Sequence, residues 1–185
     1  MMVNIVTSNA GKLMEFQSAL GDVMELRHLP IGYVEVQTDS LEDVVRHGLD
    51  ELRDRGVGNV IIDDSGLFID ALGGFPGVYS SYAYSTLGNA GVLKLLSGVG
   101  ERRARFRCCI GASIDGIDDI VLCEDCPGTI PEGKMGSGGF GFDPIFVPDG
   151  SDRSFSQMDL VEKNDLSHRG RAIRSFDVAL REALE

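Results

Sequence analysis

The sequence predicts an α/β or α+β fold built around a long twisted sheet. Short apolar segments typical of strands alternate with amphipathic helical stripes, two longer strand segments meet at Asp115-Gly116, and no repeat or charged linker divides the chain. With 185 residues, of which 43% are hydrophobic and 25% charged, the chain is long enough to bury a sizeable core. We therefore expect a single domain over residues 1–185.

The first half of the chain begins as a strand, a turn and a helix. Val3–Val6 is a short apolar strand, and the apolar residues in 13–20 share one face of a helix that a glycine ends. A second helix is expected over Leu41–Arg55, because it has an apolar stripe, a serine cap before it and a glycine after it. Val60–Ile62 is a buried strand, and Asp63-Asp64-Ser65-Gly66 marks the point where it leaves the core.

The second half alternates in the same way. In order, we expect a loop at Gly73–Gly77, a short helix at Asn89–Leu96, strands at Arg105–Ile114 and Ile117–Cys126, a long loop at Gly128–Pro148 and a last helix from near Ser167. The two strands are joined by Asp115-Gly116, because Asp-Gly suits a two-residue hairpin turn. A loop as long as Gly128–Pro148 in a compact domain is usually functional.

Charge and hydropathy limit the classes of partner. The net charge of −12 and the pI of about 4.6 disfavour a nucleic-acid polymer and an anionic membrane surface. A small anionic substrate remains compatible, because a local group of cations outweighs a distant acidic surface that salt screens within roughly 10 Å. No basic leader and no apolar run of about 20 residues is present, which predicts a cytoplasmic protein.

The cysteines lie in one region, at positions 108, 109, 123 and 126. Cys123-Glu124-Asp125-Cys126 is half of a zinc-site spacing, but no second pair of suitable ligands completes it. We expect all four to be reduced thiols.

The turn Thr7-Ser8-Asn9-Ala10-Gly11-Lys12 is the first candidate for binding. A strand that turns into a helix presents backbone amides where the helix dipole favours an anion, and the hydroxyls and Lys12 add donors for phosphate oxygens. The spacing is not that of a Walker loop, because Val6 stands at the earlier glycine position. The alternative is a capped helix with a solvated lysine.

Carboxylates at the ends of elements form the second candidate. Glu35, Asp63 and Asp64 offer the oxygens that magnesium prefers, and magnesium usually takes only one or two of them from the protein. Side chains alternate along an extended segment, so Asp63 and Asp64 do not easily serve the same place, and one of them is expected to be structural. The alternative is that all three are surface acids.

The third candidate is the glycine-rich segment Gly136–Pro144. It contains a G-x-G-x-x-G spacing, but the dinucleotide fingerprint needs a preceding strand and a following helix, which Asp143-Pro144 opposes. Phe140 and Phe142 could instead stack on a purine while Asp143 binds its edge, or they could be core aromatics on a tight turn. Further on, Lys163, His168 and Arg169 are candidates for contact with phosphate or base.

Together these motifs resemble the inosine triphosphate pyrophosphatase family in order and spacing. The blocks that carry the resemblance are Thr-Ser-Asn-Ala-Gly-Lys, Asp-Asp-Ser-Gly-Leu, Leu-Gly-Gly-Phe-Pro-Gly, Gly-Gly-Phe-Gly-Phe-Asp-Pro-Ile-Phe and Glu-Lys-Asn-x-x-Ser-His-Arg. The resemblance implies an elongated α/β fold in two lobes, with a central long twisted mixed sheet flanked by helices and a cleft between the lobes. It also implies a homodimer that hydrolyses ITP, dITP and XTP to the monophosphate and pyrophosphate, and so cleanses the nucleotide pool.

The same resemblance assigns roles to residues. Glu35 and Asp64 would hold Mg²⁺, and Asp64 would be the general base for water attack on the α-phosphorus. The substrate-binding residues that it implies are Thr7, Ser8, Asn9, Ala10, Gly11, Lys12 and Ser65 for the triphosphate, and Phe140, Gly141, Phe142, Asp143, Lys163, His168 and Arg169 for the base. Donors aimed at the purine 6-oxo group would disfavour adenine, whose 6-amino group is itself a donor.

Two points stay open. The chain has His47 where many relatives carry Lys or Asn on the helix after the metal glutamate, which puts phosphate contacts from that helix in doubt. The alternative functions are a regulator that binds a nucleotide without hydrolysis and a house-cleaning pyrophosphatase for modified pyrimidine nucleotides.

Overall fold

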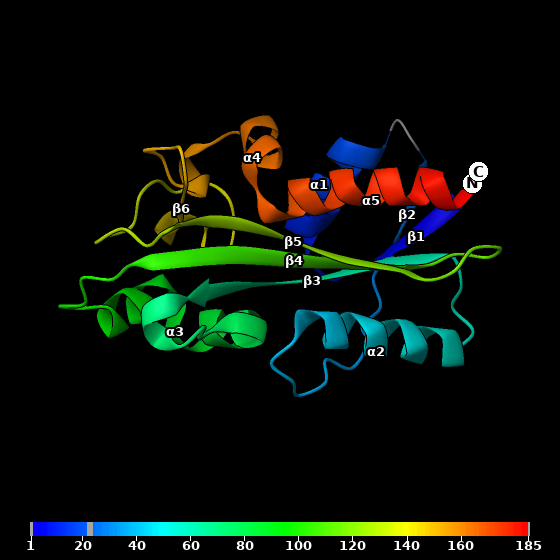
Figure 1. Ribbon diagram of the computed structural model, residues 1–185, viewed down its shortest axis with the longest axis horizontal. Coiled ribbons are helices and arrows are strands. Elements are labelled where there is room, and N and C mark those ends of the chain that lie inside the picture. The colour runs from blue at the N-terminus through cyan, green and yellow to red at the C-terminus, as the bar shows by residue number, and fades with distance from the viewer. Residues whose placement is uncertain (1, 22–23, 185) are drawn as a thin grey trace. The chain divides into compact units, whose positions relative to one another are not determined.

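The computed structural model describes residues 2–21 and 24–184. Within this range six strands form one sheet in the order β2-β1-β3-β4-β5-β6 (Figure 1). The strands are β1 (Met2–Val6), β2 (Glu25–Leu29), β3 (Val60–Ile69), β4 (Arg103–Ser113), β5 (Ile120–Thr129) and β6 (Val147–Pro148). Strand β1 pairs in parallel with β2 and β3, whereas β5 and β6 are antiparallel. The mixed sheet confirms the α/β class; the elongated outline and the cleft stay predictions.

Helices flank the sheet. They are α1 (Ala10–Leu20), α2 (Leu41–Asp54), α3 (Ser80–Leu95), α4 (Leu160–Leu166) and α5 (His168–Leu184). Short 3₁₀ turns lie at Asp70–Leu72, Gly77–Tyr79, Asp143–Ile145 and Phe155–Gln157. None of the helices in the described part of the chain has the length and apolar character needed to cross a membrane.

The chain divides into two compact units, and three strands contribute residues to both. Unit 1 contains Met1–Asp64, Cys108–Glu124 and Arg169–Glu185, and unit 2 contains Ser65–Arg107 and Asp125–His168. The boundaries fall inside β3, β4 and β5 and at the start of α5. Each unit has a hydrophobic cluster of its own.

In unit 1, helices α1 and α5 cover one face of the strands and α2 covers the other (Figure 1). The cluster beneath α1 and α5 includes Phe16, Ile110 and Phe176, which are fully buried. On the other face α2 approaches β4 closely, because a Cβ at Gly111 would lie 2.3 Å from a methyl carbon of Val45. This layering buries Asp63 and Asp64 within β3.

In unit 2 the core is rich in phenylalanine. Phe106 contacts Phe146 with ring centroids 4.7 Å apart, and Phe146 contacts Phe155 at 5.2 Å. A close backbone approach also shapes this unit, because a Cβ at Gly66 would lie 2.2 Å from the Gly77 carbonyl oxygen. The loop that the sequence places at Gly73–Gly77 is therefore packed directly against β3.

Several elements differ from the sequence predictions. Strand β3 does not leave the core at Asp63 but runs on to Ile69, and both aspartates are buried within it. The helix expected from Asn89 is confirmed as the second part of α3, after Gly88 interrupts the helix with φ 60° and ψ −173°, but the first part, which begins at Ser80, was not expected. Strand β2 and helix α4 lie in segments where no regular element was expected. Strands β4 and β5 are neighbours in the sheet, as the predicted hairpin requires, but residues 114–119 separate them, so the connection is longer than the two-residue turn expected at Asp115-Gly116.

The prediction for the cysteines is wrong in part. Cys109 and Cys123 form a disulfide between neighbouring strands, with Cα atoms 4.0 Å apart. Side chains on adjacent strands reach this separation at directly opposed positions, which the linear spacing does not reveal. Cys108 and Cys126 are buried thiols, as expected.

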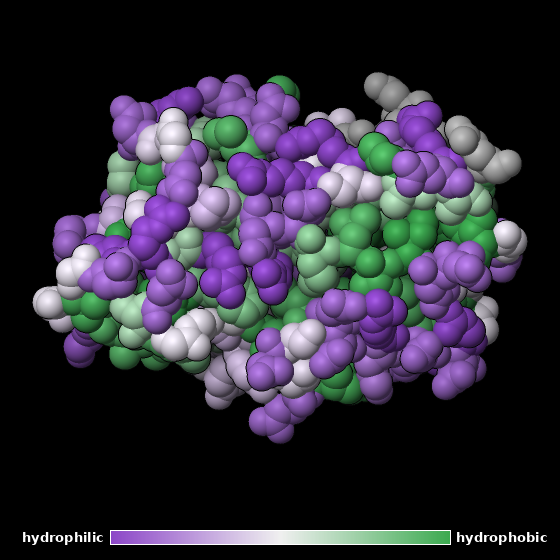
Figure 2. All heavy atoms as spheres, viewed as in Figure 1, coloured by the Kyte–Doolittle hydropathy of each residue, from purple (hydrophilic) through white to green (hydrophobic). Residues whose placement is uncertain are grey.

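The visible face of the molecule is largely hydrophilic (Figure 2). Figure 2 shows hydrophilic side chains over much of the visible face, with apolar ones between them on the right of the view.

Candidate active site

The turn between β1 and α1 is a capped helix start. The Asn9 side-chain oxygen accepts hydrogen bonds from the amides of Gly11 at 2.9 Å and Lys12 at 3.2 Å, and the Thr7 hydroxyl accepts from the Asn9 amide at 3.1 Å. The first turn of α1 carries no acidic side chain, so nothing there opposes an anion. Asn9 therefore caps α1, and Ser8, Asn9 and Ala10 are exposed.

Lys12 is not a solvated lysine. Its Nζ donates to the main-chain oxygen of Asp63 at 2.9 Å and lies 3.3 Å from the Asp63 carboxylate, with the side chain 16% exposed. The main-chain oxygen and the carboxylate of Asp63 together hold the Lys12 side chain, which is flexible when it has no partner. The structure therefore fixes the ammonium group against Asp63 on β3.

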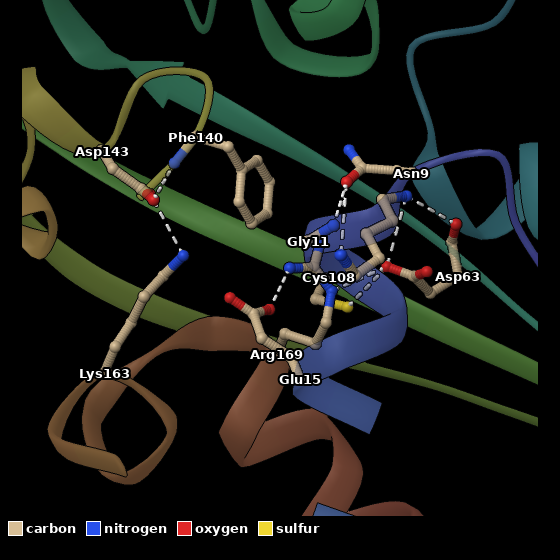
Figure 3. Close-up of polar contacts among 10 residues, drawn as sticks. Asn9, Gly11, Glu15, Asp63, Cys108, Phe140, Asp143, Lys163 and Arg169 are labelled. Carbon is tan, nitrogen blue, oxygen red and sulfur yellow. Dashed lines mark hydrogen bonds and ion pairs between the residues drawn. The ribbon is translucent and has the colours of Figure 1, made fainter. Parts of the chain in front are cut away.

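Asp63 lies at the centre of a buried charge cluster, which comprises Lys12, Asp63, Arg169 and Glu15 (Figure 3). Its carboxylate accepts from Arg169 Nε at 2.9 Å, and the same guanidinium binds Glu15. The Asp63, Arg169 and Glu15 side chains are each 1% exposed. Two positive and two negative charges balance in this cluster, which is the condition under which buried ions are tolerated.

The charges in this cluster fix its protonation. Burial alone would raise the pKa of Asp63, but Lys12 and Arg169 outweigh burial and hold the pKa below its ordinary value. Burial also raises the pKa of the neighbouring Cys108 thiol, whose sulfur lies 3.7 Å from the Asp63 carboxylate. Asp63 is thus an ionised partner of Lys12 and Arg169, as expected if it is the structural one of the two aspartates.

Tyr33 lies beside Asp63, because its hydroxyl donates to the Asp63 main-chain oxygen at 3.4 Å. Its pKa is raised first by burial of the phenol and then by the negative charges of Asp64, Asp63 and Glu35. Asp64 is 9% exposed on β3, and Glu35 is exposed in the segment between β2 and α2. That Glu35 and Asp64 lie close enough to share one ion stays a prediction.

The phenylalanine loop in unit 2 is organised by Asp143. The Asp143 carboxylate accepts from the Phe140 amide at 2.8 Å and from Lys163 Nζ at 2.8 Å (Figure 3). Lys163 Nζ also lies 4.3 Å from the centre of the Phe140 ring, a cation–π contact. Asp143 and Lys163 are 3% and 5% exposed. A buried ion pair therefore supports the half-buried Phe140 ring.

The two phenylalanines are not equivalent. Phe142 is 4% exposed in the core of unit 2, where Tyr84 meets it edge to face at 5.4 Å. Phe140 is half-buried. The core-aromatic alternative thus describes Phe142, and stacking of Phe140 on a ligand stays a prediction. A 3₁₀ turn follows the loop instead of a helix, which confirms rejection of the dinucleotide fingerprint.

The tight backbone at Gly139 leads to a testable prediction about stability. Its φ of +68° suits glycine, and a Cβ there would lie 2.2 Å from the Asp143 carboxylate. Gly139→Ala should lower the free energy of unfolding by more than about 1 kcal/mol, measured by urea denaturation. Gly133→Ala is the matched control, because a Cβ at Gly133 meets nothing within 4 Å. Equal stability of the two variants would contradict the tight contact.

His168 and Arg169 begin α5 but belong to different compact units. The His168 ring is 4% exposed and stacks on Phe106, with centroids 4.6 Å apart and planes 9° from parallel. Arg169 binds Asp63 and Glu15, as described above. Ser65, the first residue of unit 2, is half-buried, and His47 is exposed on α2.

Known proteins resemble this chain over its whole length. The sequence profile of the Ham1 family matches residues 3–178. The chain belongs to the Ham1 family. It is 46% identical to a Thermococcus kodakarensis protein named dITP/XTP pyrophosphatase, over 100% of both chains, and 45% identical to one of the same name from Pyrococcus horikoshii, over 95% of both.

Solved structures of the Ham1 family share the fold. The Staphylococcus aureus Ham1 protein superposes with a TM-score of 0.80 at 29% identity, and the match covers 98% of this chain and 99% of that one. A Ham1 protein from Coxiella burnetii gives 0.77 at 27% identity, covering 99% and 100%. These matches confirm the resemblance on which the sequence analysis relied.

Three residues of this Ham1 chain were not anticipated as part of the site region. Glu15 lies one turn after Lys12 on α1 and partners Arg169, and Ser80 donates to Gly77 and accepts from the Leu67 amide. Asn89, on α3, donates to the Gly141 carbonyl. The only sequence signal for Glu15 was its i+3 spacing from Lys12, which puts both on one helix face.

Proposed function

We propose that this chain hydrolyses deaminated purine nucleoside triphosphates, namely ITP, dITP and XTP, to the nucleoside monophosphate and pyrophosphate. The observation that carries the proposal is 46% identity over the full length to a protein named dITP/XTP pyrophosphatase. The reaction is that of a nucleoside-triphosphate pyrophosphatase, and the substrate is a small anion, which an acidic protein binds only through local cations. The residues described above supply such cations.

The turn Thr7–Lys12 is the phosphate-binding element in this proposal. Lys12 is held by Asp63 at the start of α1, next to the exposed Ser8 and Ala10, so its charge is placed before substrate arrives. Pre-placement reduces the entropy lost when the ammonium meets phosphate oxygens. Ser65 follows Asp64 directly and is assigned to the same phosphates.

Magnesium fits the carboxylates of unit 1. Glu35 and Asp64 are the two carboxylates of unit 1 that the family resemblance assigns to the ion. A donor set of two carboxylates suits Mg²⁺, which completes its shell with phosphate oxygens and water, better than it suits a cation that needs a full protein cage. When bound, the ion would neutralise charge on the departing pyrophosphate.

Asp64 is assigned as the general base. Asp63 is committed to Lys12 and Arg169, and because side chains alternate along a strand, we expect Asp64 to face the other side of β3. Its carboxylate would accept the proton of the water that attacks the α-phosphorus. The phosphorus–oxygen bond to the leaving pyrophosphate breaks as the new one forms.

The base is assigned to Phe140, Lys163 and His168. Phe140 offers a half-buried ring for stacking, and buried donors aimed at the 6-oxo group would be left unpaired by the 6-amino group of adenine. Gly141, Phe142 and Asp143 shape the loop that carries the ring. Arg169 retains its place in the site as the partner of Asp63, and direct contact of Arg169 with the base stays a prediction.

The proposal is tested by incubating the protein with Mg²⁺ and ITP, dITP, XTP, ATP or dUTP, and measuring pyrophosphate release. We expect release from the deaminated purine nucleotides with kcat/KM at least about 100-fold above that for ATP, because a buried unpaired donor weakens the wrong base by roughly 1–3 kcal/mol and more than one donor is present. Binding of ITP without pyrophosphate release would favour the regulator, and preferred cleavage of modified pyrimidines would favour the other alternative. Both outcomes overturn the proposal.

The assembly and location that the sequence suggested also stay proposals. A homodimer is implied by the family resemblance, and a cytoplasmic protein without nucleic-acid or membrane partners is consistent with the acidic composition.

A further inference from the structure

Helix α3 is broken directly before Asn89. Gly88 has φ 60° and ψ −173°, a backbone conformation that is practically restricted to glycine, and the helix resumes after it. Asn89 is 6% exposed, whereas Tyr84 and Leu87 before the break are more than 40% exposed. The break therefore turns a polar side chain inward, which needs an explanation because a buried amide requires partners.

The partner of Asn89 is the phenylalanine loop. Its Nδ2 donates to the Gly141 carbonyl oxygen at 3.2 Å, while its Oδ1 has no hydrogen-bond partner among the described residues. Gly141 stands between Phe140 and Phe142 and has φ +59°. The loop therefore contacts the donor group of the Asn89 amide, because the opposite orientation would place Oδ1 against the Gly141 carbonyl oxygen.

Helix α3 holds the loop at a second point. Tyr84 meets the Phe142 ring edge to face, with centroids 5.4 Å apart and planes at 88°. On its other side the loop is tied by Asp143, which binds the Phe140 amide and Lys163. The peptide that follows Gly141 Cα is therefore fixed from α3, and its direction decides how the two phenylalanine side chains diverge.

We propose that Asn89 is a positioning residue for nucleobase recognition: by holding the Gly141 carbonyl it sets the Phe140 ring for stacking on the base. The inference rests on the proposed function and adds a residue that touches no substrate. The substrate class concerned is any purine triphosphate whose base stacks on Phe140. Loss of the hydrogen bond affects the base and leaves the phosphates untouched.

The test compares two substitutions with different chemistry. Asn89→Asp keeps the shape but replaces the donor by an acceptor, and Asn89→Ala removes both. KM and kcat for ITP are measured as IMP formation, and the inhibition constant of tripolyphosphate, which carries phosphates without a base, is measured alongside. We expect KM for ITP to rise about 3- to 10-fold in both variants, as loss of one hydrogen bond allows. We expect kcat to change less than about twofold and tripolyphosphate inhibition to be unchanged.

Ser85→Ala is the matched control on the same helix, because the Ser85 hydroxyl bonds only to Tyr82 within α3 among the contacts the structure shows. It should leave both constants unchanged. An unchanged KM for ITP in folded Asn89→Asp overturns the inference, and so does a parallel rise in the tripolyphosphate constant, which a general structural role produces. If Asn89→Asp does not fold, KM for ITP and the inhibition constant of tripolyphosphate in Asn89→Ala test the inference instead. Failure of the unsubstituted protein to hydrolyse ITP instead overturns the proposed function, and this inference with it.

Discussion

Asp64→Asn is expected to lower kcat for ITP by at least about 100-fold, because a positioned general base contributes roughly 10²- to 10⁴-fold to such a step. The amide cannot accept the proton of the attacking water, although it fills the same space on β3. Asp64 is 9% exposed, so the substitution removes a charge without opening a cavity. Steady-state pyrophosphate release at saturating ITP measures the loss.

The proposed second role of Asp64, as a magnesium ligand, requires a separate control. The assay is repeated over a range of Mg²⁺ concentrations, and the loss should persist at saturation if Asp64 is the base. Recovery of kcat at high Mg²⁺ would show that it is a ligand alone. Asp118→Asn, at an exposed position after the β4–β5 turn, should retain full activity and controls for the change from acid to amide.

Local signals in the sequence were enough for β1, α1 and α2 of unit 1. Helix α2 was predicted to within one residue, because its serine cap, apolar stripe and terminal glycine all act within a few residues of the chain. The turn into α1 followed equally from Asn9, whose side chain caps the helix it precedes. Such features depend on neighbours in sequence, which a single chain displays.

Contacts between distant residues explain most of what was missed. Asp63 looked like the exit of a strand from the core, yet it stays buried because Lys12 and Arg169, 51 and 106 residues away, neutralise it. Strand β2 escaped notice because its exposed Glu and Arg hide the pattern of an edge strand. The cross-strand disulfide needed the strand register, which no spacing of cysteines supplies.

The candidate site shows the same division. Motifs identified which residues matter, but they did not show which residues pair with one another. Phe140 and Phe142 were equivalent in the sequence, and only their burial separates a ring available for stacking from a core ring. Asn89 carried no signal at all, because its partner lies 52 residues later in a loop without regular structure.

Asp63→Asn should lower the free energy of unfolding by about 3–5 kcal/mol, the usual effect of removing one partner from a buried ion pair. The substitution leaves the positive charges of Lys12 and Arg169 against Glu15 alone, in a site where Arg169 is 1% exposed. Urea denaturation near pH 7 measures the change. Glu42→Gln is the matched control, because the Glu42–Arg46 pair is about half exposed and such pairs contribute less than about 1 kcal/mol.

The same substitution should change how stability depends on pH. The pKa of Asp63 in the folded protein lies below its ordinary value, so its ionised form stabilises the fold above the unfolded pKa of about 3.9. This contribution is lost as the pH falls through the folded pKa. The difference in unfolding free energy between the unsubstituted protein and Asp63→Asn should therefore shrink below about pH 4 and stay constant above about pH 5.

Charge balance also predicts how two substitutions combine. Arg169→Met alone leaves Asp63 and Glu15 against Lys12, whereas Arg169→Met together with Asp63→Asn leaves one positive and one negative charge. The double variant should therefore lose less stability than the two single variants added together, by about 1–3 kcal/mol of coupling. Additive losses would mean that shape alone holds these residues in place, and a buried Asp63 would then need a reason other than the charges around it.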